Sequence, residues 1–188
     1  DFSVELKGEA EEVNKSFRWL GLAMIGAVFL VYMVMAAQYE SLLHPFVIMF
    51  TLPLSFVGVA WTLFLTGTTL NINSIIGVIV LVGIVVKNAI LLVDYTNVLR
   101  GRGLSLDEAV VTATRTRTRP ILMTASTAML GMFPMALGLG EGSELNYPLA
   151  RSVVGGLAAG TFLTLVIIPV VYTSFEKARA RRNHAAKA

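Results

Sequence analysis

Long apolar runs alternate with short polar joints along this chain. Five runs are almost free of charged residues, and each is roughly 20 residues long, which is enough to cross a hydrocarbon core of ~30 Å at ~1.5 Å per residue. A buried helix of a large soluble protein explains one such run, but not five in series. The pattern therefore predicts membrane-spanning helices at residues 19–39, 46–65, 72–98, 120–139 and 152–174.

Composition agrees with this reading. Of the 188 residues, 55% are hydrophobic and only 14% are charged, and the mean hydropathy is +0.72. A soluble domain of this size needs more charge to cover its surface. We therefore predict an all-α membrane protein, a five-helix transmembrane bundle over residues 19–174 that lies in the lipid bilayer.

The longest joint, "RGRGLSLDEAVVTATRTRTRP", has its own helical pattern. Ser105 followed by Glu108 is typical of a capping box, and apolar residues then recur at helical spacing. We expect a cytoplasmic amphipathic helix over about 105–117, lying along the membrane surface. Pro120 suits the first turn of the next span, where its missing N–H is not needed.

Basic residues predict the orientation of the bundle. Most of them lie in the loop after residue 98 and in the basic tail, 175–188, and few lie on the other side. Because lysine and arginine are concentrated in cytoplasmic segments, we expect that loop and tail inside and residues 1–18 outside. Residues 1–18 are polar, have no initiator Met and no signal peptide. We therefore expect the chain to be a piece of a longer protein.

One span carries polar residues within it. In "GIVVKNAILLVDYTN", Lys87 and Asn88 lie inside the apolar run and Asp94 lies two turns later. A lysine at the centre of a span costs roughly 2.5–3.5 kcal/mol on insertion. Asp94 shares a helix face with Lys87 but lies ~10.5 Å further along the axis, too far for a direct ion pair. The sequence therefore predicts a cation whose partner lies outside this chain; snorkelling of Lys87 to the interface is the structural alternative.

The other candidate chemistries find little support in the sequence. There are no cysteines, and the histidines, His44 and His184, lie in a loop and in the tail, so no spacing predicts a metal site. No nucleophile–base arrangement or cofactor fingerprint predicts an enzyme, and we expect no cofactor. The basic tail does not indicate nucleic-acid binding beside so much apolar sequence.

Several motifs resemble one transporter family. "GIVVKNAILLVDYTN", "RTRPILMT", "GMFPMALGLGEGSE" and "VVGGLAAGTFLTLVIIPVVY" are similar to the last spans of the resistance–nodulation–division (RND) efflux permeases, as are "VYMVMAAQYESLLHPFVIMFTLPLSFVGV" and "LTGTTLNINSIIGV". The resemblance covers about residues 10–175. The Lys-Asn pair favours the hydrophobe/amphiphile multidrug branch over the heavy-metal branch.

The resemblance implies much about the whole protein. Such permeases have twelve spans in two halves, sit in the bacterial inner membrane, usually form homotrimers and can work with a periplasmic adaptor and an outer-membrane channel. This chain resembles spans eight to twelve, with residues 1–18 ending a periplasmic insertion. Protons drive export of drugs or other amphiphiles.

The resemblance also implies site residues. The proton relay pairs two aspartates of the missing N-terminal half with a lysine and a hydroxyl, which match Lys87 and Thr124, with Asn88 as a neighbour. Asp94 and Arg117 are weaker candidates. Thr124 has a structural alternative, since a threonine in a span often bonds back to its own helix.

Other features predict structure or leave alternatives open. Gly155, Gly156 and Gly160 form a smooth face that predicts close helix packing. A non-transporting multispan scaffold or sterol-sensing-type relative would not need Lys87. A metal-exporting RND member would need methionine or carboxylate pairs along a path, and the sequence offers none.

Overall fold

The computed structural model describes residues 2–39, 43–140 and 142–185, and nearly all of them are helical. The helices of these described residues are α1 (Phe2–Tyr39), α2 (Leu43–Met49), α3 (Thr51–Leu65), α4 (Ile72–Gly101), α5 (Leu106–Ala136) and α6 (Ser143–Ala185). Only a turn at Phe50 separates α2 from α3, so the two form one rod. The all-α fold is confirmed.

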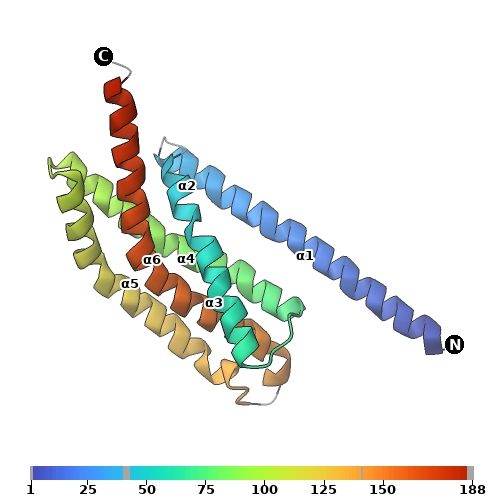
Figure 1. The fold of residues 1–188 in the computed structure, drawn as a ribbon. Helices are drawn as coiled ribbons and strands as arrows, with labels where there is room; N and C mark the ends of the chain where they lie inside the picture. The colour runs from blue at the N-terminus through green and yellow to red at the C-terminus, as the bar shows by residue number, and fades with distance from the viewer. Residues whose placement is uncertain (1, 40–42, 141, 186–188) are drawn as a thin grey trace.

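Within the described residues, four helical segments are long and apolar enough to cross a membrane: Glu11–Tyr39, His44–Leu65, Ile72–Gly101 and Ser143–Ala178. Helix α5 is not one of them by this measure, since its first half carries arginines and its apolar half ends at Ala136. It nevertheless packs along α4 and α6 as the fifth rod of the bundle (Figure 1).

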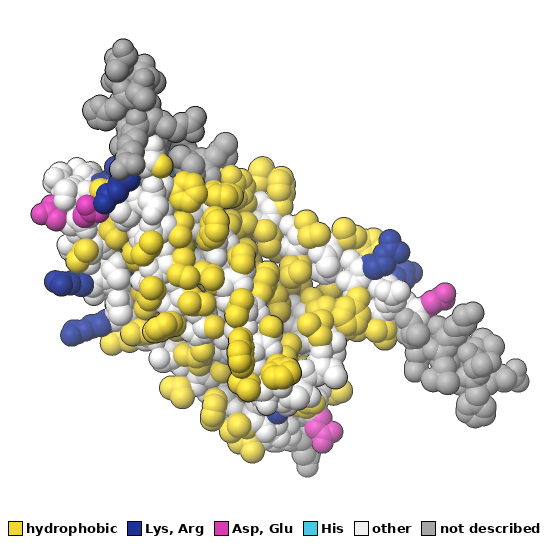
Figure 2. Space-filling view, in the orientation of Figure 1, with side chains coloured by type: hydrophobic (Ala, Val, Ile, Leu, Met, Phe, Trp, Pro, Cys, Tyr) yellow, Lys and Arg dark blue, Asp and Glu magenta, His cyan; other side chains and the backbone are white. Residues whose placement is uncertain are grey.

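Helix α6 is the centre of the bundle. It packs against α3, α4 and α5, whereas α1 leans away and touches the rest mainly through α2 and α4 (Figure 1). Only 6% of the apolar window of α1 is buried, compared with 44% for that of α6. Figure 2 shows the result on one face, where hydrophobic side chains cover the middle and charged ones lie at the margins. This is the surface expected of a protein surrounded by lipid.

Glycines allow the close approach of α6 that the sequence predicted. A Cβ on Gly156 would lie 2.1 Å from Leu81 Cδ2, and one on Gly155 would lie 1.9 Å from Thr62 Oγ1. On α4 itself, a Cβ on Gly77 would lie 2.7 Å from the carbonyl oxygen of Leu149. Side chains at these positions would force the helices apart, so the predicted smooth face is confirmed.

One helix differs from what we expected. We predicted a separate surface helix over 105–117 and a span beginning at Pro120, but α5 runs through both without a break, with Pro120 inside it. The proline removes one backbone hydrogen bond, and the packing of α5 keeps the helix continuous despite that loss. The apolar side of its first half is buried in the core through Ala109, Val110 and Ala113, so this half packs against the bundle; its position relative to the membrane stays a prediction. The predicted capping box of Ser105 and Glu108 is present.

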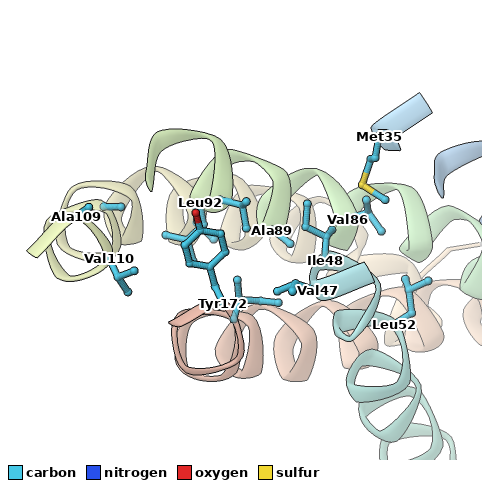
Figure 3. Packing of buried hydrophobic residues seen from close by; sticks show 14 of the residues in the cluster. Met35, Val47, Ile48, Leu52, Val86, Ala89, Leu92, Ala109, Val110 and Tyr172 are labelled. Carbon is cyan, nitrogen blue, oxygen red and sulfur yellow. The ribbon is translucent and has the colours of Figure 1, made fainter. Parts of the chain in front are cut away.

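The main core lies where α1 ends and α6 continues toward its tail, which we call the tail end of the bundle; the opposite end, at the α5–α6 connection, is the hairpin end. In Figure 3, Met35 and Ile48 meet Val86 from α4, and Tyr172 lies beside Leu92. A second cluster nearer the hairpin end includes Val59, Leu81 and Leu157. Together they hold α4 rigidly, which fixes the polar residues that it carries.

Candidate functional site

Lys87 lies on an exposed side of α4, midway along an apolar helix. Within the described residues it makes no salt bridge, and Asp94, also exposed, makes none either. The sequence prediction that these two residues do not pair is therefore confirmed. An ammonium group at this depth with no carboxylate from the described chain is the most unusual feature of the molecule.

Asn88, the next residue, points the other way. Its side chain is only 4% exposed, and its Nδ2 is buried with no hydrogen-bond partner among the described residues. A buried amide donor without an acceptor costs free energy. Lys87 and Asn88 therefore carry polarity to two different sides of α4, one open and one inside the bundle.

Thr124 lies on α5, and its hydroxyl donates to the carbonyl of Ile121 at 3.0 Å. This is the local bond that we gave as the structural alternative. The side chain is nevertheless exposed, so the hydroxyl oxygen can accept a further hydrogen bond. Thr124 therefore has a structural bond and remains able to serve in a relay.

Arg117 connects α5 to α4. Its guanidinium carbon lies 4.5 Å from the centre of the Tyr95 ring, and its Nε is buried without a hydrogen-bond partner among the described residues. A guanidinium stacked on an aromatic face is held electrostatically by the ring. The sequence analysis missed Tyr95, because nothing in an isolated sequence pairs it with an arginine on another helix.

The Arg117–Tyr95 contact also indicates how high the other candidate residues lie along the bundle axis. Helices α4 and α5 are antiparallel, and Asn88 lies seven residues before Tyr95 while Thr124 lies seven residues after Arg117. Equal steps along antiparallel helices reach the same height, so Lys87 and Asn88 are level with Thr124. Helix spacing thus puts the three main candidates at about the same level along the bundle and leaves Arg117 about two turns toward the tail end.

A cluster of polar side chains at the tail end was not predicted from the sequence. Arg100 donates from Nη1 to Glu176 Oε2 at 2.6 Å and to the Tyr172 hydroxyl at 3.2 Å, and that hydroxyl donates to Asn97 Oδ1 at 2.5 Å. His44 Nε2 lies 3.8 Å from Glu176 Oε1. These contacts join α2, α4 and α6 across long stretches of sequence, which is why no local pattern announced them.

Arg151 plays a similar part at the hairpin end. Its Nε donates to the carbonyl of Ala136 at 2.9 Å, its Nη1 donates to Thr68 Oγ1 at 2.7 Å, and its guanidinium lies 4.2 Å from the centre of the Tyr147 ring. A cation beside the last carbonyls of α5 also complements the helix dipole. The two ends of the bundle are therefore fastened by arginines, and Lys87 lies between them without such partners.

A bundle of long apolar helices with a lysine midway along one of them defines the class as a helical membrane protein. Comparison with known proteins identifies the family: residues 1–176 match the model of the AcrB/AcrD/AcrF family. The chain belongs to this family, which is the RND permease family that its motifs resemble.

Individual relatives agree. The chain is 40% identical over 181 residues to the swarming motility protein SwrC of Bacillus subtilis (96% of this chain, 17% of the relative) and 42% identical over 172 residues to the multidrug resistance protein MdtC of Erwinia tasmaniensis (91% and 16%). Among solved structures it is similar to crystal form II of a heavy metal efflux pump, at 38% identity and a TM-score of 0.80, covering 89% of this chain and 16% of that one. The chain thus spans about a sixth of the length of these relatives.

Proposed function

We propose that this chain is part of a proton-driven RND efflux permease and supplies the lysine and threonine side of its proton relay. The observation that carries the proposal is Lys87: an ammonium group on an open side of an apolar helix, with no carboxylate partner in the described chain. Since the relatives are about six times longer, the aspartates that pair with Lys87 would come from the remainder of the protein.

In the proposed cycle, ionised aspartates hold the Lys87 ammonium by charge. Protonating them weakens that attraction, and the ammonium moves toward the hydroxyl of Thr124, which lies in the same layer. The two protonation states then favour two arrangements of the helices, and a proton gradient drives the exchange between them. Asn88 borders this layer, and Arg117 holds α5 against α4 two turns away.

The proposal places the chain as spans eight to twelve of a twelve-span permease in the bacterial inner membrane, with the tail cytoplasmic. Assembly as a homotrimer, with a periplasmic adaptor and an outer-membrane channel, follows the family. Sequence similarity to the multidrug resistance protein MdtC favours export of drugs or other amphiphiles. Likeness to a heavy metal efflux pump favours metal export as the second candidate.

The proposal is tested by replacing Lys87 with Met in the full-length permease. Methionine keeps the length of the apolar stem and removes the charge, so insertion and packing survive. We expect drug resistance to fall to the level of cells without the permease, at matched expression. Lys177→Met is the control, since Lys177 pairs with Asp107 on the exposed surface at 2.9 Å. Normal resistance with Lys87→Met would overturn the relay and leave snorkelling as the role of this lysine.

Orientation has its own test. The chain has no cysteine, so single cysteines at Ser3 and Ser105 label without background from this part of the protein. We expect an impermeant thiol reagent added outside to reach residue 3 and not residue 105. Labelling of both from one side would contradict the proposed orientation.

A further inference from the structure

In the middle of α4 and α6, three buried side chains have a polar atom without a hydrogen-bond partner among the described residues. Thr161 is 3% exposed, Thr164 is fully buried and Asn88 is 4% exposed. Among the described residues, the Oγ1 atoms of both threonines and the Nδ2 of Asn88 have no hydrogen-bond partner. We call these three residues the buried polar triad.

The two threonines differ from their neighbours in this respect. Several other hydroxyl side chains of the bundle donate to a carbonyl of the preceding turn, among them Thr96 to Leu92 at 2.8 Å and Thr173 to Pro169 at 2.7 Å. That bond satisfies the hydroxyl at little cost. Thr161 and Thr164 do not form it, so their hydroxyls are free for a partner that no described residue supplies.

Helix packing brings the triad to one level. Helices α4 and α6 are parallel: Tyr172 bonds to Asn97, 75 residues before it, and the contacts of Gly156 with Leu81 and of Gly160 with Val85 keep the same separation. With the same separation of 75 residues, Asn88 lies level with Leu163, which is next to Thr164. The triad therefore lies within about one helical turn along the bundle axis.

Helix α5 borders the same level. It runs antiparallel to α6 between the Asp107–Lys177 contact at one end and the Arg151–Ala136 contact at the other. Spacing along the two helices sets Thr161 beside Thr124 and Ala125, and Thr164 beside Ile121. The triad is thus level with the layer of Lys87 and Thr124, on the inner side of α4.

We propose that the buried polar triad binds water between α4, α5 and α6. A buried water commonly makes about three hydrogen bonds to polar groups that are otherwise unsatisfied. It accepts from the Asn88 amide and exchanges bonds with two hydroxyls, each of which can donate or accept. A metal cation such as sodium fits this site less well than water. The unsatisfied Asn88 atom is a hydrogen-bond donor, so its hydrogens would point at the cation.

Resting on the proposed relay, this site gives protons a polar position inside the bundle, one residue from Lys87. Water there can exchange hydrogen bonds with Asn88 while Lys87 faces the open side of α4. The consequence is that loss of the triad slows proton-coupled export without removing any charge.

The direct test is a density map of the purified full-length permease at a resolution that shows ordered water. We expect density within hydrogen-bonding distance of Asn88 Nδ2 and at least one of the two threonine hydroxyls. A map that shows water at other buried polar groups, with both hydroxyls bonded to their own helix and none here, would overturn the proposal.

A double-mutant cycle gives an independent readout. If Asn88 and Thr164 share a water, the loss of Tm in Asn88→Leu/Thr164→Val is smaller than the sum of the two single losses, because the second change removes a group already left unsatisfied. The matched control is Asn88→Leu with Thr173→Val, for which we expect additivity, since Thr173 bonds within its own helix. Additivity in both pairs would overturn the proposal.

The outcomes separate the two proposals. If Lys87→Met abolishes export while the cycle is additive, the relay stands and the water site does not. If Lys87→Met leaves export intact while water density and coupling are present, the site binds water but serves no relay.

Discussion

Helix α4 has two contrasting sides. Toward α6 it presents Gly77, Leu81, Val85 and Ala89, all buried, and the backbones come close enough for glycine to be required at Gly77. On the other side, Val80, Lys87, Asp94 and Val98 are exposed at helical spacing. The first side packs against α6, whereas on the second side the described residues supply no ion-pair partner to Lys87 or Asp94.

This contrast teaches how the helix serves two purposes. The packed side fixes the height and rotation of α4, because a glycine contact tolerates no slippage. The open side can then hold an ammonium group at a defined position without local partners. Changes on the packed side should mainly reduce stability, whereas changes on or near the open side should mainly reduce transport.

The largest effect is expected from Gly77→Ala. The added Cβ would lie 2.7 Å from the Leu149 carbonyl oxygen and 3.2 Å from Leu149 Cα, and backbone atoms cannot yield as a flexible side chain can. We expect a loss of about 1–3 kcal/mol, as for other overpacked sites. Thermal unfolding of the purified permease measures it.

The control for this change is Gly101→Ala at the end of the same helix. Nothing lies within 4 Å of a Cβ at Gly101. We therefore expect stability at or slightly above the unmodified level. An equal loss of Tm in both variants would mean that the packing of α4 on α6 does not limit stability.

An intermediate effect is expected at Tyr95, which lies at the border between the two sides. Tyr95→Leu removes the ring beneath the Arg117 guanidinium, an interaction worth roughly 0.5–2 kcal/mol, whereas Tyr95→Phe keeps it. We expect the Leu variant to transport several-fold more slowly at equal expression and the Phe variant to match the unmodified protein. Equal impairment of both would point to the hydroxyl instead.

A smaller effect is expected for Thr124→Val. The change removes one hydroxyl and its bond to Ile121 but leaves every charge in place. We expect drug resistance between those of the unmodified protein and Lys87→Met, with the free energy of unfolding lowered by no more than about 1 kcal/mol. Susceptibility assays across a range of external pH measure it, and a complete loss at every pH would rank Thr124 with Lys87.

The smallest effect concerns Glu108, far from both sides of this contrast. Hydrogen bonds from the Ser105 hydroxyl and backbone N–H lower the pKa of Glu108 below its ordinary value of 4.5. A lowered pKa stabilises the fold above the ordinary pKa and ceases to do so as the pH falls through the lowered value. Glu108→Gln should therefore reduce Tm slightly at pH 7, and the difference should fade as the pH falls through the lowered pKa of Glu108. A difference that persists at low pH would assign the effect to packing.

The sequence predicted the long apolar segments, the Ser105 cap and the glycine contacts, because each depends on local composition or spacing. It did not predict the continuity of α5, since a proline favours a helix boundary, whereas α5 continues through Pro120. Lys87 and Thr124 were found from motifs, and their roles stay predictions.

Tertiary contacts account for what the sequence could not give. The Arg117–Tyr95 contact and the Arg100–Glu176 pair join helices that are distant along the chain. Thr161 and Thr96 are both threonines in apolar helices, and only the structure separates the hydroxyl that bonds within its helix from the one that does not. Local patterns carry no information on that difference.

The central place of α6 has a consequence for how the protein is made. Because α6 is the last of these helices to leave the ribosome and packs against α3, α4 and α5, those three cannot complete their core until it arrives. During that interval the glycine-lined sides of α3 and α4 face lipid or the insertion machinery. A nascent chain that stops before Ser143 would therefore be a substrate for membrane quality control, even though every earlier helix has been inserted.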